Sequence, residues 1–252
     1  MVHEILGDIL LFGLIVLICF LIDFKNSKRS WHFLLLFIVI GFADNISYTI
    51  TDAYPNMQII KSDIWNNYLV CNWSAKIYSI IFALLILFSF KNMITPKDIG
   101  LRFKQNQNSI RFSLIFVLFF FVAAIIVGFS GRKGDFDLKV LAYLAIMPGL
   151  NEELIYRGFL LGFLNKIFDK KFRVLKTNFG WGAILTSIIF GLLHGFGITE
   201  NYQIQFDNIP NVILTGVFGF IFALMKERSG SLIFPIIAHN TIDFFHLLFR
   251  MI

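Results

Sequence analysis

The sequence predicts an all-α, polytopic membrane helical bundle of about eight transmembrane helices. Of its 252 residues, 57% are hydrophobic and 15% are charged, whereas soluble domains carry about 25% charged residues. Apolar runs such as 79–90 and 113–129 are too long for loops, and a helix needs roughly 20 apolar residues to cross about 30 Å of hydrocarbon. Basic loops between these runs account for the net charge of +6, so no nucleic-acid partner is expected.

Eight apolar stretches are expected to form the spans, in chain order residues 5–22, 32–50, 75–90, 111–129, 139–165, 181–197, 210–225 and 232–250. The first is not expected to be a cleaved signal peptide, because Glu4 and Asp8 replace the usual basic start and no small-residue cleavage site follows. The longest outer loop is expected at residues 52–72. We divide the chain into four N-terminal transmembrane helices (1–130) and a C-terminal transmembrane core of four more (131–252).

Alternate loops differ in their content of Lys and Arg. One set of loops, at 25–29, 91–111, 166–176 and 226–228, holds fifteen basic residues, and the other set holds five. Loops rich in Lys and Arg stay in the cytoplasm during membrane insertion. The asymmetry therefore predicts a multi-pass protein of the cell membrane with both termini outside the cytoplasm.

Clusters of polar and ionisable side chains stand out in three of the predicted spans, and ionisable side chains cost about 2.5–3.5 kcal/mol each at the centre of a membrane. At a rise of about 1.5 Å per residue, Glu152 and His194 each lie roughly 20 Å from the cytoplasmic ends of their spans, and Asp243 roughly 16 Å. The three segments are therefore expected to meet at one depth. The polar residues are Asn151, Glu152, Glu153 and Arg157 in span five, His194 in span six, and His239, Asn240 and Asp243 in span eight.

The spacing of the charges in span five suggests two different roles for its glutamates. Glu153 and Arg157 are four residues apart, so they share a helix face and can form an ion pair that leaves neither charge unpaired. Glu152 is rotated by about 100° from Glu153. It is therefore expected to be free to face a different neighbour.

The remaining polar residues supply the chemistry of amide hydrolysis, which needs a base to activate water and donors to hold the oxyanion. A carboxylate surrounded by apolar groups is a stronger base than one in water. Glu152 with His194 suits the first role. His239 with Asn240 or Asp243 suits the second.

Other residues of these spans are expected to shape the site. His246 lies seven residues after His239 and could line the same helix face. Pro148 and Pro235 are expected to kink spans five and eight, and glycines such as Gly149 to permit close helix packing.

Three motifs together carry a family resemblance: Glu152-Glu153-x-x-x-Arg157, Phe190-x-x-x-His194 and His239-x-x-x-Asp243. In these motifs, over about residues 139–250, the sequence resembles the CPBP (CAAX protease and bacteriocin-processing, Abi) family of intramembrane proteases. The resemblance implies an intramembrane endopeptidase of the CAAX-prenyl-protease-like type, in which Glu152 and His194 activate water. It also implies that His239 and the residue four positions later hold the oxyanion.

This sequence departs from the family at that last position, where Asp243 replaces the Asn that the prenyl endopeptidases favour. A carboxylate repels an oxyanion unless it is protonated. Asp243 is therefore expected to orient His239 or, with the histidines, to bind a metal.

No cofactor is expected, and the alternative is zinc bound by Glu152, His194 and His239. The expected partners are membrane lipid and a hydrophobic peptide or small protein substrate. The alternative function is a non-enzymatic membrane partner, such as a bacteriocin immunity or signalling-regulatory protein, in which the polar residues serve only packing. The sequence leaves the substrate and the oligomeric state open.

Overall fold

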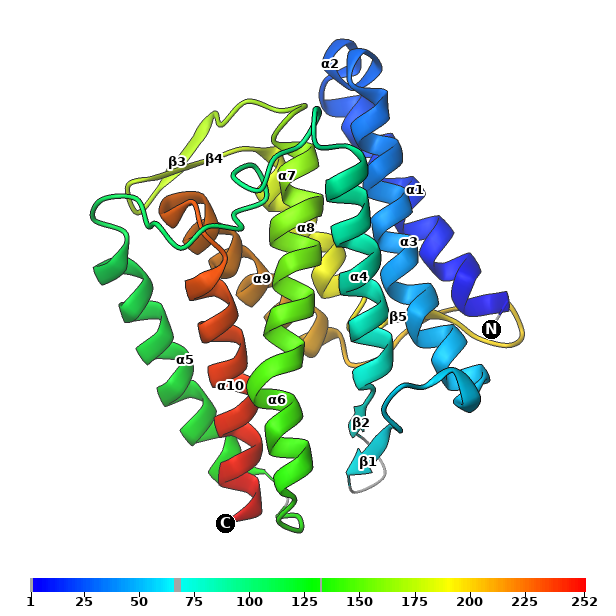
Figure 1. The fold of residues 1–252 in the computed structure, drawn as a ribbon, viewed down its shortest axis with the longest axis vertical. Coiled ribbons are helices and arrows are strands. Elements are labelled where there is room, and N and C mark those ends of the chain that lie inside the picture. Colours follow the sequence, from blue (N-terminus) through cyan, green and yellow to red (C-terminus); the bar gives the residue numbers. More distant parts are fainter. Residues whose placement is uncertain (1, 66–68, 132) are drawn as a thin grey trace.

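The computed structural model describes residues 2–65, 69–131 and 133–252, and helices make up most of it (Figure 1). Four helices in this part are long and apolar enough to cross a membrane: α1 (Val2–Ile22), α3 (Trp31–Ala53), α5 (Ile110–Ser130) and α9 (Ile209–Ser229). Two shorter apolar helices are α4 (Trp73–Ser89) and α8 (Trp181–Leu192). The prediction of an all-α membrane bundle is confirmed.

The two predicted spans that carry most of the polar residues are also helical. Span eight is α10 (Ile233–Met251), and span five is an uninterrupted run of α6 (Leu138–Glu152), the π-helix η2 (Glu153–Leu160) and α7 (Leu161–Leu164). Each predicted span therefore falls on a helical segment.

Short elements connect the spans. They are α2 (Phe24–Arg29), the 3-10 turn η1 (Pro55–Met57), and three antiparallel hairpins formed by β1 (Asp63–Trp65) with β2 (Leu69–Cys71), β3 (Phe172–Val174) with β4 (Thr177–Phe179), and β5 (Phe196–Ile198) with β6 (Ile204–Phe206). The predicted outer loop 52–72 contains the first hairpin, where the buried Trp65 donates its Nε1–H to the Asp135 carbonyl at 2.8 Å.

Helices begin and end where the sequence supplies capping groups. The Asn72 side chain accepts a hydrogen bond from the Ala75 amide at the start of α4, and Asp137 accepts from the Lys139 amide at the start of α6. Gly230 ends α9 with a φ of +69°, a conformation that suits glycine at a helix C-terminus.

The helices pack closely where glycines face a neighbour. α10 packs against α5 and α6, α8 against α9, and η2 contacts α3, α4, α8 and α9. A Cβ on Gly149 would lie 2.6 Å from Asn240 Oδ1 and 2.7 Å from the Ile236 carbonyl oxygen, and a Cβ on Gly128 would lie 2.7 Å from Phe249 Cβ. These contacts agree with the expected use of small residues between membrane helices.

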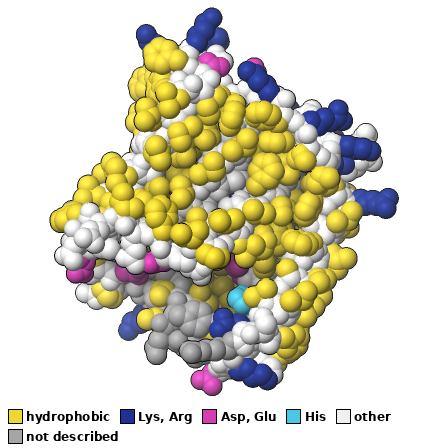
Figure 2. Space-filling view, turned by 180° about the vertical axis from the view of Figure 1, so that it is seen from behind, with side chains coloured by type: hydrophobic (Ala, Val, Ile, Leu, Met, Phe, Trp, Pro, Cys, Tyr) yellow, Lys and Arg dark blue, Asp and Glu magenta, His cyan; other side chains and the backbone are white. Residues whose placement is uncertain are grey.

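The basic loops gather at one end of the bundle, near α2 and the β3–β4 hairpin, while both termini lie toward the other end (Figure 1). Figure 2 shows Lys and Arg concentrated at that end, and apolar side chains over the middle of the molecule.

At the basic end, Lys166 Nζ lies 2.8 Å from Asp98 Oδ1. Burial would raise the pKa of the Asp98 carboxyl, but hydrogen bonds from Lys166 and Thr95 hold that pKa below its usual range.

The prediction that span six extends to residue 197 is wrong, because α8 ends at Leu192. Gly195 follows, and the Asp207 amide donates to its carbonyl at 2.7 Å. A Cβ at Gly195 would lie 2.5 Å from the Asp207 carbonyl oxygen. The returning strand of the β5–β6 hairpin therefore needs glycine at this point, and the apolar run continues as a hairpin instead of a helix.

Candidate active site

The π-helix η2 begins where α6 meets α10. Pro148 lies inside α6 and has no N–H to donate, and the Gly149 amide donates to Asn240 Oδ1 of α10 at 2.8 Å. Four residues later the helix widens into η2 at Glu153, and π-helical turns are frequent at functional sites. The expectation that Pro235 kinks α10 is wrong, because Pro235 is the third residue of that helix, where an N–H has no intrahelical acceptor.

Glu153 and Arg157 form the predicted ion pair. Arg157 Nη1 lies 3.0 Å from Glu153 Oε1, and both side chains are 0% exposed. The guanidinium also lies over the Phe190 ring at 4.0 Å from its centroid. A Cβ on Gly219 would come within 2.7 Å of Arg157 Nη2, so the glycine leaves the space that this buried cation occupies.

His239 lies among three carboxylates. Its Nδ1 is 2.8 Å from Glu153 Oε1, and its Nε2 is 3.4 Å from Asp243 Oδ2 and 3.7 Å from Glu152 Oε2. The ring stacks on Phe222 with an interplanar angle of 10°. Ionised carboxylates only accept hydrogen bonds, so this environment suits the imidazolium form, in which both ring nitrogens carry a proton.

His194 lies just beyond the end of α8 and not within a span. Its Nδ1 is 2.7 Å from the Phe190 carbonyl oxygen. Because a carbonyl can only accept, Nδ1 carries the proton, and Nε2 of the neutral ring is an acceptor. The Phe190 ring lies 4.6 Å from the ring of His194 and 6.2 Å from that of His239. The two histidines therefore flank one phenylalanine, and His239 also lies 3.7 Å from Glu152.

Glu152 has a charged partner that was not predicted. Lys76 of α4 places Nζ 2.9 Å from Glu152 Oε1 and 3.3 Å from Asn151 Oδ1, and its side chain is 4% exposed. Glu152 therefore faces a different neighbour from Glu153, and an ammonium group from the N-terminal half bonds to its Oε1. The other oxygen, Oε2, remains on the side of His239.

A second set of buried polar residues lies behind Lys76. Asn151 Nδ2 is 3.0 Å from Ser79 Oγ and 3.3 Å from Asp44 Oδ1, and Ser79 donates to Asp44 Oδ1 at 2.5 Å. All three residues are buried. We call Asp44, Lys76, Ser79 and Asn151 the Asp44 cluster, which connects α3 and α4 to the end of α6.

A cavity of about 300 Å³ opens beside Glu152 and Asp243, and Lys76 and His246 also line it. His239 is not among the described lining residues of this cavity, so a face shared by His246 and His239 stays a prediction, and the space is large enough for several water molecules. Asn240, an expected oxyanion donor, makes contacts between two helices. Its amide group donates to the Ile146 carbonyl at 3.3 Å and accepts from the Gly149 amide, so its side chain connects α10 to α6.

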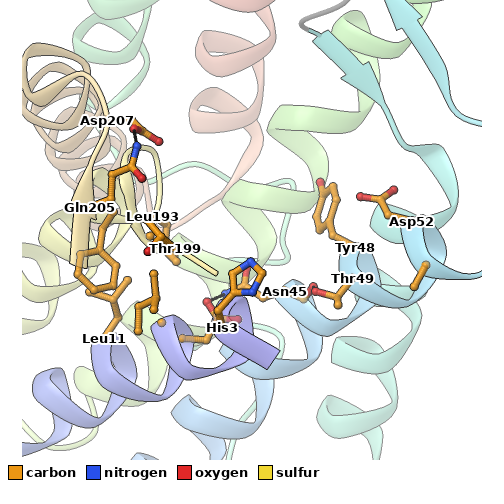
Figure 3. A pocket seen from close by; sticks show the side chains of 16 residues that line it. His3, Leu11, Asn45, Tyr48, Thr49, Asp52, Leu193, Thr199, Gln205 and Asp207 are labelled. Atoms are coloured by element: carbon orange, nitrogen blue, oxygen red, sulfur yellow. Dashed lines mark hydrogen bonds between the residues drawn. The ribbon is translucent and has the colours of Figure 1, made fainter. Parts of the chain in front are cut away.

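A larger cavity, of about 640 Å³, lies between α1, α3 and the β5–β6 hairpin (Figure 3). His3, Asp52 and Asp207 line it, and Tyr48 lines both cavities. Neither Glu152 nor His239 is among its described lining residues. The larger cavity therefore adjoins the candidate site at Tyr48 but does not contain its reactive groups.

Comparison with known proteins assigns the C-terminal half. Residues 134–245 match the family model for Rce1-like type II CAAX prenyl endopeptidases. The chain is 22% identical over 245 residues to the "Putative membrane peptidase YdiL" of Bacillus subtilis. The aligned residues cover 89% of this chain and 90% of the relative. Over the matched segment, the chain is similar to the CPBP family, which supports the resemblance carried by the three motifs.

A second relative is an "Uncharacterized 24.3 kDa protein" of Escherichia coli, which is 27% identical over 119 residues, or 46% of this chain and 45% of the relative. No solved structure matches the chain. At the level of the family, the protein is a CAAX-protease-like peptidase and a multi-pass membrane protein. The division at residue 131 stays a prediction.

Zinc, the alternative cofactor, does not fit the arrangement of side chains. The Lys76 ammonium bonds to Glu152 Oε1, where a second cation would be repelled. Within residues 2–65, 69–131 and 133–252, no group of three His, Cys, Asp or Glu side chains is placed to share one ion.

Sequence reasoning missed Lys76 and Asp44, although the signal was present. Both are ionisable residues inside apolar runs, as are Glu152 and His239, and the same membrane cost applies to them. Neither residue has an opposite charge four residues away in its own helix, so the spacing of charges in the sequence does not single them out. Both also lie outside the segment that matches the CPBP family.

Proposed function

We propose that this protein is an intramembrane endopeptidase that hydrolyses a peptide bond with water activated by Glu152 and His194. One observation carries the proposal. Glu152 Oε2 lies 3.7 Å from His239 Nε2, and Glu152 lines a cavity large enough for several water molecules. A carboxylate that can take a proton from water, an imidazole nitrogen that can accept a hydrogen bond and an imidazole N–H that can donate to an oxyanion are groups that suit amide hydrolysis.

In the proposed reaction, Glu152 Oε2 takes one proton from the water molecule. His194 Nε2 accepts a hydrogen bond from the other O–H of that water and so orients it. The water oxygen attacks the peptide carbonyl carbon, and the electron pair of the carbonyl moves to its oxygen. His239 Nε2–H donates to this oxyanion. The intermediate then collapses with cleavage of the C–N bond, and Glu152 returns its proton to the leaving nitrogen, which departs as a neutral amine.

The other polar residues support His239 in this proposal. Glu153 accepts from Nδ1 and fixes the ring, and Arg157 balances the charge of Glu153. Asp243 orients Nε2 at 3.4 Å and does not bind the oxyanion, because two negative groups repel each other. The reaction is proposed to be metal-free. This assignment is supported by the ion pair between Lys76 and Glu152, which places an ammonium group against one oxygen of that carboxylate.

We further propose that the basic end of the bundle faces the cytoplasm, so that both termini lie outside it. This orientation is supported by the fifteen Lys and Arg residues of the loops at that end. The substrate is proposed to be a hydrophobic peptide or small protein that reaches the site from the membrane.

A second candidate function is a non-enzymatic membrane partner, such as an immunity or signalling-regulatory protein. It is favoured by the ion pair between Lys76 and Glu152, since a paired carboxylate can also serve packing alone. The two functions differ in what replacement of the carboxylate does.

The test compares Glu152→Gln with Glu227→Gln. Glu227 is an equally suitable buried carboxylate, since its side chain is 1% exposed and contacts Lys170, but it lies at the basic end. Membranes that contain each variant or the wild type are compared by peptide mass spectrometry. We expect a precursor peptide to accumulate only with Glu152→Gln, because loss of a general base costs about 10²–10⁴-fold in rate. Equal peptide profiles for all three proteins would overturn the peptidase and favour the partner function.

A further inference from the structure

Lys76 is an unusual residue for its position. It is the fourth residue of α4, and its side chain is 4% exposed. A cation in the first turn of a helix is disfavoured by the helix dipole, and an unpaired charge in the membrane interior is costly. The contacts of Lys76 must therefore compensate both effects.

These contacts are directed at the candidate base. Nζ lies 2.9 Å from Glu152 Oε1 and 3.3 Å from Asn151 Oδ1, and it lies over the Tyr48 ring at 5.4 Å from the centroid. Asn151 is itself held by Ser79 and Asp44. The ammonium group is thus fixed by neighbours that are themselves fixed, which leaves Lys76 little freedom to move.

The geometry has a consequence for the two oxygens of Glu152. Lys76 holds Oε1, and Oε2 is directed toward His239 Nε2 at 3.7 Å. Both Lys76 and Glu152 line the cavity of about 300 Å³. If Lys76 were absent, the carboxylate could rotate, and either oxygen could turn away from the water that the reaction uses.

We propose that Lys76 is a positioning residue for the reaction. It anchors Oε1 of Glu152, so that Oε2 receives the proton of the attacking water. This inference rests on the proposed function and deepens it, because the base is held by a helix that lies outside the CPBP-matched segment 134–245. The N-terminal helices are then part of the active site and not only a membrane anchor.

The competing explanation is that Lys76 only balances buried negative charge. The test measures kcat and KM for Lys76→Met and Lys76→Arg in lipid vesicles, with the peptide identified by the comparison of Glu152→Gln with wild type. Lys226→Met is the matched control, because Lys226 is also buried and bonds to the Asp98 carbonyl, but it lies at the basic end. All rates are expressed per folded molecule, and melting temperatures are recorded alongside.

For Lys76→Met we expect kcat to fall about 100-fold, the loss that a misplacement of about 1 Å can cause, with KM within about threefold of wild type because Lys76 acts through Glu152. Lys226→Met is expected to lower the melting temperature and to leave kcat unchanged. A kcat for folded Lys76→Met equal to that of wild type, or an equal loss of kcat in both Met variants, would overturn the proposal.

If Lys76→Met does not fold, Lys76→Arg decides. Arginine keeps the charge but places a larger, planar group beside Glu152. We expect a melting temperature near that of wild type and a kcat about tenfold lower, whereas unchanged kcat would show that charge balance is sufficient. Glu152→Gln separates this proposal from the function itself. If that variant still cleaves the peptide, the base is wrongly assigned, and if it is inactive while Lys76→Met is fully active, only the role of Lys76 fails.

Discussion

Both halves of the chain bury charged side chains within the membrane-spanning region, but these charges are paired in different ways in the two halves. In the C-terminal half, Glu153 and Arg157 pair within one helix at a spacing of four residues. In the N-terminal half, Asp44 and Lys76 have no such partner, and the Asp44 cluster forms only when α3, α4 and α6 come together. Local spacing therefore reveals the first kind of pair, and only the fold reveals the second.

Glu152 lies where the polar residues of the two halves come into contact. Glu152 belongs to the C-terminal half, yet its Oε1 is held by Lys76 and its Oε2 faces His239. One carboxylate thus connects both polar clusters. Substitutions that separate the clusters should therefore have different consequences from substitutions within either one.

The largest effect on stability is expected within the C-terminal pair. Arg157→Met removes the buried cation that pairs with Glu153 and leaves His239 beside that carboxylate, and the loss of one partner of a buried pair costs about 3–5 kcal/mol. The double variant Arg157→Met/Glu153→Gln should regain part of that loss. Thermal unfolding in detergent measures both. A single variant as stable as wild type would mean that Glu153 is not dependent on Arg157.

A smaller effect is expected where α6 and α10 touch. Gly149→Ala would place a Cβ 2.6 Å from Asn240 Oδ1, and forcing extra volume into a packed contact costs about 1–3 kcal/mol. Gly197→Ala is the control, because a Cβ there meets nothing within 4 Å. The expected result is a lower melting temperature for Gly149→Ala alone. If both variants melt together, the contact between the two helices is looser than described.

The smallest effect is expected for Asp243→Asn. Asparagine can still accept a hydrogen bond from His239 Nε2, so cleavage should stay within about tenfold of wild type, or about 1.4 kcal/mol in activation free energy. Peptide cleavage by the purified variant measures this effect. A loss as large as that of Glu152→Gln would contradict the orienting role and give Asp243 a direct part in the chemistry.

The sequence predicted the bundle because long apolar runs have few other solutions in lipid. It also predicted that Glu152 and His239 meet, because depth along a helix follows from residue number. It could not give the pairing of Glu152 with Lys76, since the neighbours of a helix face depend on which helices pack together. The end of α8 was missed for a similar reason, because the apolar run 181–197 continues into a hairpin that Gly195 permits.

The most direct test of the account is a double-mutant cycle on the pair that joins the halves. The free energy of unfolding in detergent is measured for wild type, Lys76→Met, Glu152→Met and the double variant. Each single change removes one partner of this ion pair, so we predict that the double variant is less destabilised than the sum of the singles by about 0.5–3 kcal/mol, the range seen for residues in contact. Effects that simply add would show that Lys76 and Glu152 do not interact, and would contradict a site built by both halves of the chain.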